Sequence, residues 1–288
     1  MIIDSHAHYT TNRFLGEYRY LTFQNGEYTA AEGNLTTMME AFLEAGIVHS
    51  IEPAIDLASN ERILAICRAH PDRFSPVLGC HPTRCIKEKW ADRKKLARLI
   101  RENNIVAVGE TGLDYHHPRK EQQRFKQFLW FWYQLGLAQK AKLPLVLHIR
   151  QADRDALRIL KFHPARKNGG VVHCFNGDWA TARQYLAMGF HIGIGGSLLQ
   201  KPENSQALEE AVRYIPLDRI LIETDAPYVH PYFGEGPGKK PLKKSRNCSM
   251  ILPVVIAKIA ELKNISPETV AEETAKNAIR LFGLKVNA

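Results

Sequence analysis

Short apolar runs alternate along the chain with longer segments in which apolar residues recur every three or four positions. Most of the runs are rich in Val and Ile and apolar on both faces, as are strands of a parallel sheet covered on both sides. They predict eight strands, at residues 2–6, 48–53, 74–78, 105–109, 145–149, 170–174, 191–195 and 220–224. The periodic segments predict helices, at residues 34–44, 61–70, 94–103, 121–140, 154–162, 180–188, 205–213, 248–262 and 267–282.

The strict alternation of strand and helix predicts βαβ crossovers and a parallel sheet. Eight such units favour a closed barrel over an open sheet, so the predicted fold class is α/β, a (β/α)₈ TIM barrel. Such a barrel takes roughly 250 residues as one domain. The sequence has 288 residues and shows no repeat and no linker. We therefore expect a single domain, residues 1–288.

The composition narrows the class of protein. With 45% hydrophobic and 24% charged residues, the chain is not expected to be disordered. Its five cysteines include no CxxC pair, which argues against a disulfide framework or a thiolate zinc site and favours a cytoplasmic location. The first residues lack the features of a signal peptide, and no apolar run of about 18 residues predicts a membrane span.

The formal net charge of +9 favours a polyanionic partner such as nucleic acid, because neutralising phosphates releases counterions. Simple solubility explains the same charge equally well. A basic segment, residues 234–246, follows the eighth strand and is expected to be a loop on the catalytic face. Its basic side chains either steer a polyanion or form an ordinary solvated surface. They are Lys239, Lys240, Lys243, Lys244 and Arg246.

Residues of the types that bind metals lie at the C-terminal ends of the predicted strands, where a barrel carries its catalytic groups. They are His6, His8, Glu110, His148, His173 and Asp225. His6 and His8 are two positions apart and are expected to point to one face and share a cation. Glu110 is placed to bridge two cations with its two oxygens. His148 and His173, on adjacent strands, would complete the second site.

Each of these signals has an ordinary structural explanation when taken alone. An isolated His-x-His pair is usually not a metal site, a lone buried histidine is usually a hydrogen-bonded core residue, and an acidic residue at a strand end can cap a helix. Six such residues in barrel order favour a metal centre instead. The mixed nitrogen and oxygen donors suit Zn, Mn, Fe or Co, whereas Mg prefers more oxygen. Two divalent metal ions are expected, and their identity stays open among these five.

Seven stretches of the sequence resemble the TatD-type metal-dependent deoxyribonucleases of the amidohydrolase superfamily. They are IIDSHAH (2–8), LGCHP (78–82), VGETGLDY (108–115), PLVLHIR (144–150), GVVHCF (170–175), GIGGSLL (193–199) and LIETDAPY (221–228). The resemblance implies an amidohydrolase-like barrel hydrolase with two, occasionally three, divalent metals and often a nucleic-acid substrate. It also implies the same ligand roles: His6 and His8 for the first metal, Glu110 as the bridge, His148 and His173 for the second metal, and Asp225 as the ligand after strand eight.

The expected mechanism is attack by a metal-activated water, with Asp225 accepting its proton. His81, after the third strand, either holds the substrate phosphate, protonates the leaving oxygen or packs a loop. Arg150 either clamps phosphate with its planar fork or pairs with an acidic residue. Glu223 and Asp4 are expected to orient a ligand histidine.

Aromatic residues that could stack on bases lie near the catalytic face. They are Tyr115, Phe175, Tyr228, Tyr232 and Phe233. Residues 12–32 form a segment longer than is typical of the family, and His116-His117-Pro118 is an unusual loop beside Glu110.

Three functions compete. The first is a metal-dependent phosphodiesterase acting on DNA as an exonuclease. The second is a hydrolase of a non-nucleic-acid ester, amide or lactone, or a D-aminoacyl-tRNA deacylase. The third is a non-catalytic metal-binding or nucleic-acid-binding protein, against which the six filled ligand positions argue. The fold alone does not separate the first two. No membrane and no protein partner is expected, and the protein is predicted to be a monomer or a small homo-oligomer.

Overall fold

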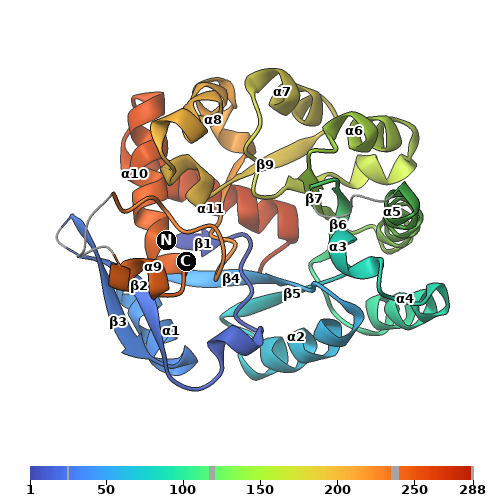
Figure 1. Ribbon diagram of the computed structural model, residues 1–288, viewed down its shortest axis with the longest axis horizontal. Helices are drawn as coiled ribbons and strands as arrows, with labels where there is room; N and C mark the ends of the chain where they lie inside the picture. Colours follow the sequence, from blue (N-terminus) through green and yellow to red (C-terminus); the bar gives the residue numbers. More distant parts are fainter. Residues whose placement is uncertain (25, 117–120, 235–239, 287–288) are drawn as a thin grey trace.

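Eight parallel strands form one sheet, in the order β1-β4-β5-β6-β7-β8-β9-β10 (Figure 1). This computed structural model describes residues 1–24, 26–116, 121–234 and 240–286. Backbone hydrogen bonds join the chain after β10 to the chain after β1, including His8 N to Ala226 O at 2.8 Å, so the sheet closes into a barrel. The predicted (β/α)₈ fold is confirmed. The strands are β1 (Ile2–Asp4), β4 (Ile47–Pro53), β5 (Phe74–Leu78), β6 (Ala107–Asp114), β7 (Leu145–Arg150), β8 (Gly170–Val172), β9 (Phe190–Ile194) and β10 (Ile220–Ile222).

Helices alternate with these strands and surround them (Figure 1). They are α1 (Leu35–Glu44), α2 (Leu57–Ala69), α3 (Pro82–Cys85), α4 (Arg93–Glu102), α5 (Glu121–Ala141), α6 (Asp153–Phe162), α7 (Trp179–Ala187), α8 (Pro202–Tyr214), α9 (Lys240–Lys244), α10 (Leu252–Lys263) and α11 (Pro267–Phe282). The helix predicted from residue 248 begins only at Leu252, after a 3₁₀ turn over Ser249–Ile251. Among the described residues, no helix combines the length and the apolar character that a membrane span requires.

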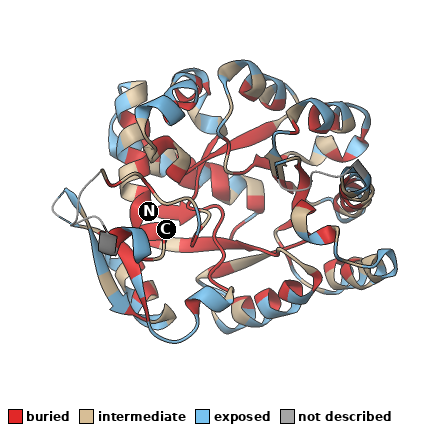
Figure 2. Cartoon of the chain, in the orientation of Figure 1, coloured by how far each residue is buried: buried red, intermediate tan, exposed pale blue. Residues whose placement is uncertain are grey.

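The core has two parts, one inside the barrel and one between the strands and the helices. Inside, seven strands each contribute one small or branched residue, as in a packed barrel. These are Ile3, Ile51, Val77, Ala107, Val146, Val171 and Leu221. Residues of α11, including Ala278 and Phe282, join this cluster and cover one end of the barrel. Figure 2 shows the result: the strands are almost entirely buried, and the surrounding helices alternate buried and exposed faces.

Two antiparallel strands, β2 (Tyr18–Gln24) and β3 (Glu27–Gly33), form a separate hairpin between β1 and α1. The sequence prediction placed no strand there, although it identified residues 12–32 as unusually long. The hairpin is anchored to the chain after α9, because Arg246 N donates to Arg19 O at 2.8 Å and Leu21 N donates to Arg246 O at 2.9 Å.

Several predicted boundaries are wrong near the site. The strand predicted to end at residue 109 continues to Asp114, because its pairing with β7 runs on to Asp114 and Arg150. Glu110 therefore lies within a strand rather than at its end. Conversely, β1, β8 and β10 end two, one and three residues before His6, His173 and Asp225, respectively, so these side chains are carried on the following loops.

Candidate metal centre

The structure brings together all six residues predicted to bind metal. His6 and His8 follow β1, His173 follows β8 and Asp225 follows β10, while Glu110 and His148 lie within the neighbouring strands β6 and β7. Because these segments are the C-terminal parts of parallel strands, they meet at one end of the barrel. Asp225 has a left-handed backbone conformation, with φ of 54°, which aspartate tolerates better than most residues.

A first ligand group is formed by His6, His8 and Asp225 with one oxygen of Glu110. The Nε2 atoms of His6 and His8 are 3.2 Å apart. Asp225 Oδ1 lies 3.2 Å from His8 Nε2 and 3.7 Å from His6 Nε2. Glu110 Oε2 is 3.7 Å from His6 Nε2 and 3.8 Å from His8 Nε2. Four donor atoms, from β6 and from the loops after β1 and β10, thus face a common point.

A second ligand group surrounds the other oxygen of Glu110. Glu110 Oε1 lies 2.7 Å from His173 Nε2 and 2.9 Å from His148 Nδ1, and these two nitrogens are 3.0 Å apart. The carboxylate of Glu110 therefore divides its two oxygens between two sets of imidazole nitrogens. This arrangement is what a carboxylate bridging two cations requires.

The remote nitrogens of His8 and His148 lie within hydrogen-bond distance of acceptors, and that of His173 faces a carboxylate, so the other nitrogen of each ring faces the centre. His8 Nδ1 is 3.1 Å from Pro53 O, and His148 Nε2 is 3.2 Å from Asp114 Oδ2. His173 Nδ1 lies 3.7 Å from Glu223 Oε1. A ring N–H donated outward leaves the other nitrogen with a free lone pair, the form that binds a metal ion.

Asp114 was given no role in the sequence analysis, although it falls within the VGETGLDY stretch. Its carboxylate holds the outer nitrogen of His148 and also accepts a hydrogen bond from His116 N at 2.9 Å. Strand alternation could have identified it, because Glu110, Gly112 and Asp114 occupy alternate positions of one strand and share a face.

Glu223 contacts the second ligand group from behind. It accepts a hydrogen bond from Cys174 N and faces His173 Nδ1. Gly193, on β9, makes room for it, since a Cβ at that position would overlap the Glu223 carboxylate. Glu223 therefore lies where it could orient the His173 ring, as predicted.

Asp4 differs from its predicted role, because its carboxylate contacts the His6 backbone rather than the imidazole ring. Oδ1 accepts from His6 N and from Thr224 N, each at 3.1 Å. Oδ2 accepts from the hydroxyls of Thr224 and Ser249, each at 2.7 Å. Asp4 thus ties the segment that carries His6 to the segment that carries Asp225.

The electrostatics of the centre favour an ionised Glu110 and a neutral His6, whereas the other three ligand histidines hold a proton more readily. Burial lowers the pKa of each of these three, but the carboxylates that face it raise the pKa above its usual value. Burial alone raises the pKa of Glu110, but the imidazoles of His81 and His173 hold this pKa well below its usual value. Burial and the neighbouring His173 lower the pKa of His6 well below that of a free imidazole. An ionised Glu110 and a neutral His6 are the protonation states that a divalent cation prefers.

His81 also reaches the centre, and Arg150 does not. His81 Nε2 lies 3.5 Å from Glu110 Oε1, while His81 Nδ1 accepts from Thr83 N at 3.1 Å. Burial and the adjacent His148 lower the pKa of His81 to about 3. Arg150 ends β7 with an exposed side chain, and its guanidinium contacts none of the six ligand residues in the described structure.

The basic segment after β10 is partly outside the described residues, since Lys239 lies there. Lys243 and Lys244, in α9, are exposed beside β3. Arg246 is half-buried, with its Cζ 4.4 Å from the Tyr18 ring centroid and 5.8 Å from that of Phe14. It therefore packs the hairpin instead of projecting freely. Asn247 donates to Tyr228 O at 2.6 Å and to Thr224 O at 3.0 Å, and so stabilises this loop.

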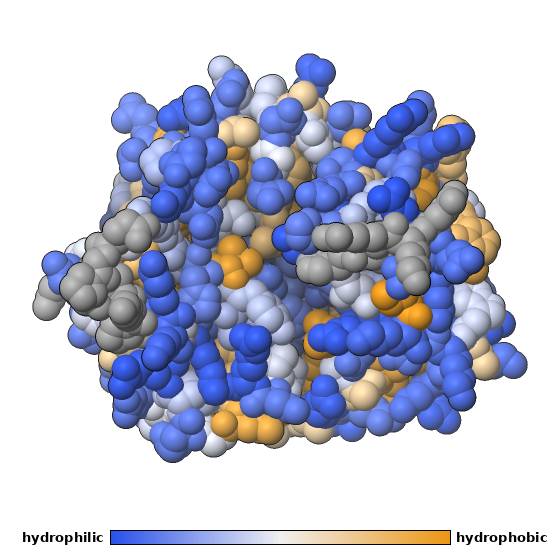
Figure 3. Space-filling model, viewed as in Figure 1, coloured by the Kyte–Doolittle hydropathy of each residue, from blue (hydrophilic) through white to orange (hydrophobic). Residues whose placement is uncertain are grey.

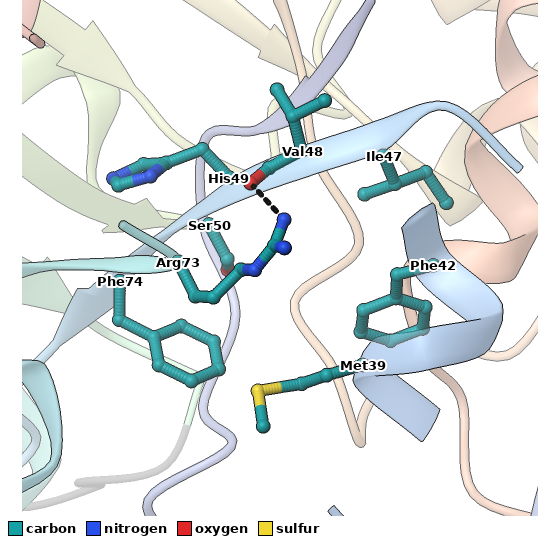
Figure 4. Close-up of a pocket in the computed structure, with 8 residues that line it drawn as sticks. All are labelled: Met39, Phe42, Ile47, Val48, His49, Ser50, Arg73 and Phe74. Atoms are coloured by element: carbon teal, nitrogen blue, oxygen red, sulfur yellow. Dashed lines mark hydrogen bonds between the residues drawn. The ribbon is translucent and has the colours of Figure 1, made fainter. Parts of the chain in front are cut away.

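A second cluster of polar residues lies at the opposite end of the strands. Figure 4 shows a small cavity near the starts of β4 and β5, lined by residues that include His49, Arg73 and Phe74. Both ring nitrogens of His49 have partners, Asp72 O at 3.1 Å and Ser75 Oγ at 2.8 Å. Arg73 donates to Val48 O at 3.4 Å. This cavity has no convergent free donors and does not compete with the metal centre.

Divalent cations fit the residues that converge at the metal centre. Three triads of these side chains have ligand atoms within 4.8 Å of one another: His6 with Glu110 and His173, His6 with His8 and Asp225, and His81 with Glu110 and His148. Burying such groups without a cation would cost several kcal/mol. Mixed nitrogen and oxygen donors are those of transition-metal hydrolase sites.

Comparison with known proteins agrees with this geometry. A family model described as TatD related DNase matches residues 3–283. YabD of Bacillus subtilis (strain 168), described as an uncharacterized metal-dependent hydrolase, is 36% identical over 211 residues, which cover 73% of this chain and 78% of YabD. A 3′-5′ ssDNA/RNA exonuclease TatD from Erwinia tasmaniensis is 32% identical over 243 residues, 84% of this chain and 90% of that protein.

A solved structure supports the fold over the full length. The crystal structure of YJJV, a TatD homologue from Escherichia coli K12, superposes with a TM-score of 0.83 at 26% sequence identity. The alignment covers 98% of each chain. The similarity to this structure therefore extends over nearly the whole chain and is not confined to part of the barrel.

Proposed function

The chain belongs to the family of TatD-related DNases and is a metal-dependent hydrolase, and from this premise we propose that it cleaves phosphodiester bonds of single-stranded nucleic acid from a 3′ end. The observation that carries the proposal is the Glu110 carboxylate, whose two oxygens face two separate groups of imidazole nitrogens. A relative that is 32% identical is named a 3′-5′ ssDNA/RNA exonuclease, and the net charge of +9 suits a polyanionic substrate.

We assign one divalent cation to each ligand group. His6, His8 and Asp225 would hold the first, His148 and His173 the second, and Glu110 would contact both. When bound, such a pair of cations activates a water molecule and neutralises charge on the phosphate. Zn, Mn, Fe, Co and Mg are all candidates, and the four histidines favour the first four over Mg.

Asp225 is the proposed proton acceptor. Its side chain is 17% exposed, whereas that of Glu110 is 3% exposed, so Asp225 is the ligand carboxylate that solvent reaches more readily. General base catalysis of this kind typically contributes about 10²–10⁴-fold. Glu110 is surrounded by imidazoles and serves to hold the two ligand groups together.

His81 and Arg150 are the proposed contacts to the substrate phosphate. The neutral imidazole of His81 accepts at Nδ1, so its Nε2–H points toward the centre and is able to donate to a phosphate oxygen. Arg150 lies at the exposed end of β7, two positions beyond His148. Its guanidinium would bind a more distant phosphate of the strand.

The test is digestion of a 5′-labelled single-stranded oligonucleotide by chelator-treated protein reloaded with Mn²⁺, Zn²⁺ or Mg²⁺ in turn. We expect a ladder of products shortened from the 3′ end. Glu110→Gln should reduce the rate by more than about 100-fold. This loss exceeds the roughly 10- to 100-fold that is typical when a residue hydrogen-bonded to a metal ligand is changed. The matched control is Glu102→Gln, since Glu102 is exposed at the end of α4 and pairs with Arg101 on the surface.

Two results would overturn the proposal. The first is hydrolysis of small esters or lactones without cleavage of nucleic acid under any of the three cations, which would support a different substrate class. The second is equal cleavage by the Glu110→Gln variant, which would place the activity outside this centre.

A further inference from the structure

An exposed tyrosine and an exposed arginine lie in contact beside the first ligand group. The Tyr228 ring centroid is 5.9 Å from that of His8, and the two rings meet edge to face. Arg13 places its Cζ 5.3 Å from the Tyr228 ring centroid. The Tyr228 side chain is 36% exposed, and Arg13 is also exposed. A cation and an open aromatic face therefore lie at the rim of the metal centre.

Both residues are carried on well-anchored backbone. Tyr228 N donates to Asp225 O at 2.8 Å, and Tyr228 O accepts from Asn247 Nδ2 at 2.6 Å. Arg13 lies in a 3₁₀ turn, Asn12–Phe14, whose Phe14 is buried against Tyr9. This turn belongs to the long connection that leads into the β2–β3 hairpin. The backbone that carries the ring is thus hydrogen-bonded on both sides, and the only cation recorded on the ring among the described residues is the exposed Arg13.

Tyr228 is the best placed of the five aromatic residues that the sequence suggested for stacking. Phe175 and Phe233 are buried, with 4% and 8% exposure, and have no open face. Tyr115 donates a hydrogen bond to Asp155 and carries the Arg124 guanidinium on its ring. Tyr232 also carries a cation, since Lys201 Nζ is 5.0 Å from its ring centroid, but Tyr232 is half-buried. Tyr228 contacts a predicted metal ligand directly and is exposed.

We infer that Tyr228 and Arg13 form a nucleotide subsite, in which an unpaired base stacks on the Tyr228 ring and Arg13 pairs with the adjacent phosphate. This inference rests on the proposed nuclease function. An exposed cation–π contact is weaker than the stacking of a base on an aromatic ring, so the base displaces Arg13 from the ring face. The released guanidinium then lies close to the phosphate backbone of the same strand.

The chemistry selects a single strand as the ligand. In a duplex both faces of each internal base are covered by neighbouring bases, whereas an unpaired base can offer a face to a protein ring. Stacking tolerates any base, so this subsite predicts preference for single-stranded substrate without strong sequence preference.

The first test compares Tyr228→Ala with wild type on a single-stranded oligonucleotide and on a series that carries one abasic nucleotide at successive positions from the 3′ end. Loss of one stacking contact should raise KM by about 10-fold, with a smaller change in kcat. One abasic position should raise the wild-type KM by a similar factor, and Tyr228→Ala should add nothing further on that substrate. Tyr228→Phe should behave as wild type, because it keeps the ring.

The second test uses binding instead of turnover. A 2-aminopurine base at the position identified by the abasic series should lose fluorescence on binding to the wild-type protein in chelator, and should keep it with Tyr228→Leu. Arg13→Ala should lower the slope of log Kd against log salt by about 0.7, the value for one phosphate contact on a single strand. Arg13→Lys should restore that slope.

The matched controls are Arg213→Ala and Tyr214→Ala. These adjacent residues are also exposed, with Tyr214 at 59%, but they end α8 near the start of β10, at the other end of the barrel. They should leave KM and the salt slope unchanged. If wild type cleaves the single strand but Tyr228→Ala and the abasic series show no loss, the subsite is overturned while the nuclease function stands. If wild type neither cleaves nor binds single strands, the function itself fails.

Discussion

At the scale of single residues, the ring nitrogens of His81 decide what chemistry it can perform. Its Nδ1 accepts from Thr83, which leaves Nε2–H pointing at Glu110. Its pKa is lowered to about 3, from an ordinary value of 6.5, so the ring loses its proton at a lower pH than a free imidazole. Nearby cations would lower this pKa further. Between pH 5 and 9, His81 is therefore a neutral hydrogen-bond donor.

We predict that His81→Ala lowers kcat/KM by about 10- to 100-fold, the cost of a hydrogen bond to a charged group, without changing the shape of the pH profile. His81→Gln should recover part of the loss because its amide also donates. The measurement is kcat/KM on single-stranded DNA from pH 5 to 9 for the three proteins. Disappearance of the alkaline limb in both variants would instead identify His81 as the acid that protonates the leaving oxygen.

The metal ligands could be predicted from the sequence because each belongs to a residue type that is costly to bury alone and lies near the end of an apolar run. The partners behind them were harder to predict. Asp114 follows Glu110 by four positions, but only the pairing of β6 with β7 brings it to His148. Asp4 contacts Thr224 and Ser249, which each follow it by more than 200 positions, and no local pattern reveals these contacts.

At the scale of secondary-structure elements, α11 covers the end of the barrel opposite the metal centre. Phe282 is 4% exposed and belongs to the cluster that includes Ile3 and Leu221 inside the barrel. We predict that Phe282→Ala lowers the free energy of unfolding by about 3–5 kcal/mol, because it leaves a cavity in a packed core. Urea denaturation followed by circular dichroism measures this change.

Phe162→Ala is the matched control, since Phe162 ends α6 with 72% exposure. It should change the free energy of unfolding by no more than about 0.5 kcal/mol. Phe282→Ala should retain its activity at temperatures where it is folded, because the catalytic residues lie at the other end of the strands. Equal effects of the two substitutions would show that α11 does not close the core.

The strands were predicted better than their boundaries, and the reason is physical. Strands buried on both faces give continuous apolar runs, which the sequence displays directly. Their ends depend on which neighbour continues the hydrogen-bond ladder, and that is a long-range property. The β2–β3 hairpin was missed because β3 is largely exposed and carries few apolar residues. The last-but-one helix was predicted to begin at residue 248, but Asn247 just before it donates to carbonyls of the loop after β10, and the helix begins only at Leu252.

At the scale of the whole molecule, the barrel brings together side chains from distant parts of the sequence that a divalent cation would join. Four imidazoles and two carboxylates from five strands converge, with nitrogen–nitrogen distances of 3.2 Å and 3.0 Å. Hydrophilic residues cover most of the face seen in Figure 3, whereas the metal-ligand histidines and Glu110 are largely buried in the barrel. Cations that bind only the folded chain therefore stabilise the entire barrel.

We predict that the melting temperature of chelator-treated protein rises with the concentration of Mn²⁺ or Zn²⁺. At a free metal concentration 100 times Kd, one site contributes about 2.7 kcal/mol. For a chain of this size that corresponds to about 5–10 °C, because each kcal/mol moves Tm by about 2–4 °C. Differential scanning fluorimetry across a metal titration measures the effect. Asp114→Asn should shift the titration to about 10- to 100-fold higher metal, since Asp114 orients His148.

Glu110→Ala should remove most of the rise, because it takes one oxygen from each ligand group at once. Glu102→Ala, on the surface of α4, should leave the titration unchanged. In chelator the Glu110→Ala protein should melt below wild type, because it loses the carboxylate that pairs with His148 and His173, so its response to metal is measured from its own metal-free melting temperature. A melting temperature that is independent of metal in the wild-type protein would contradict a metal centre built from these six side chains.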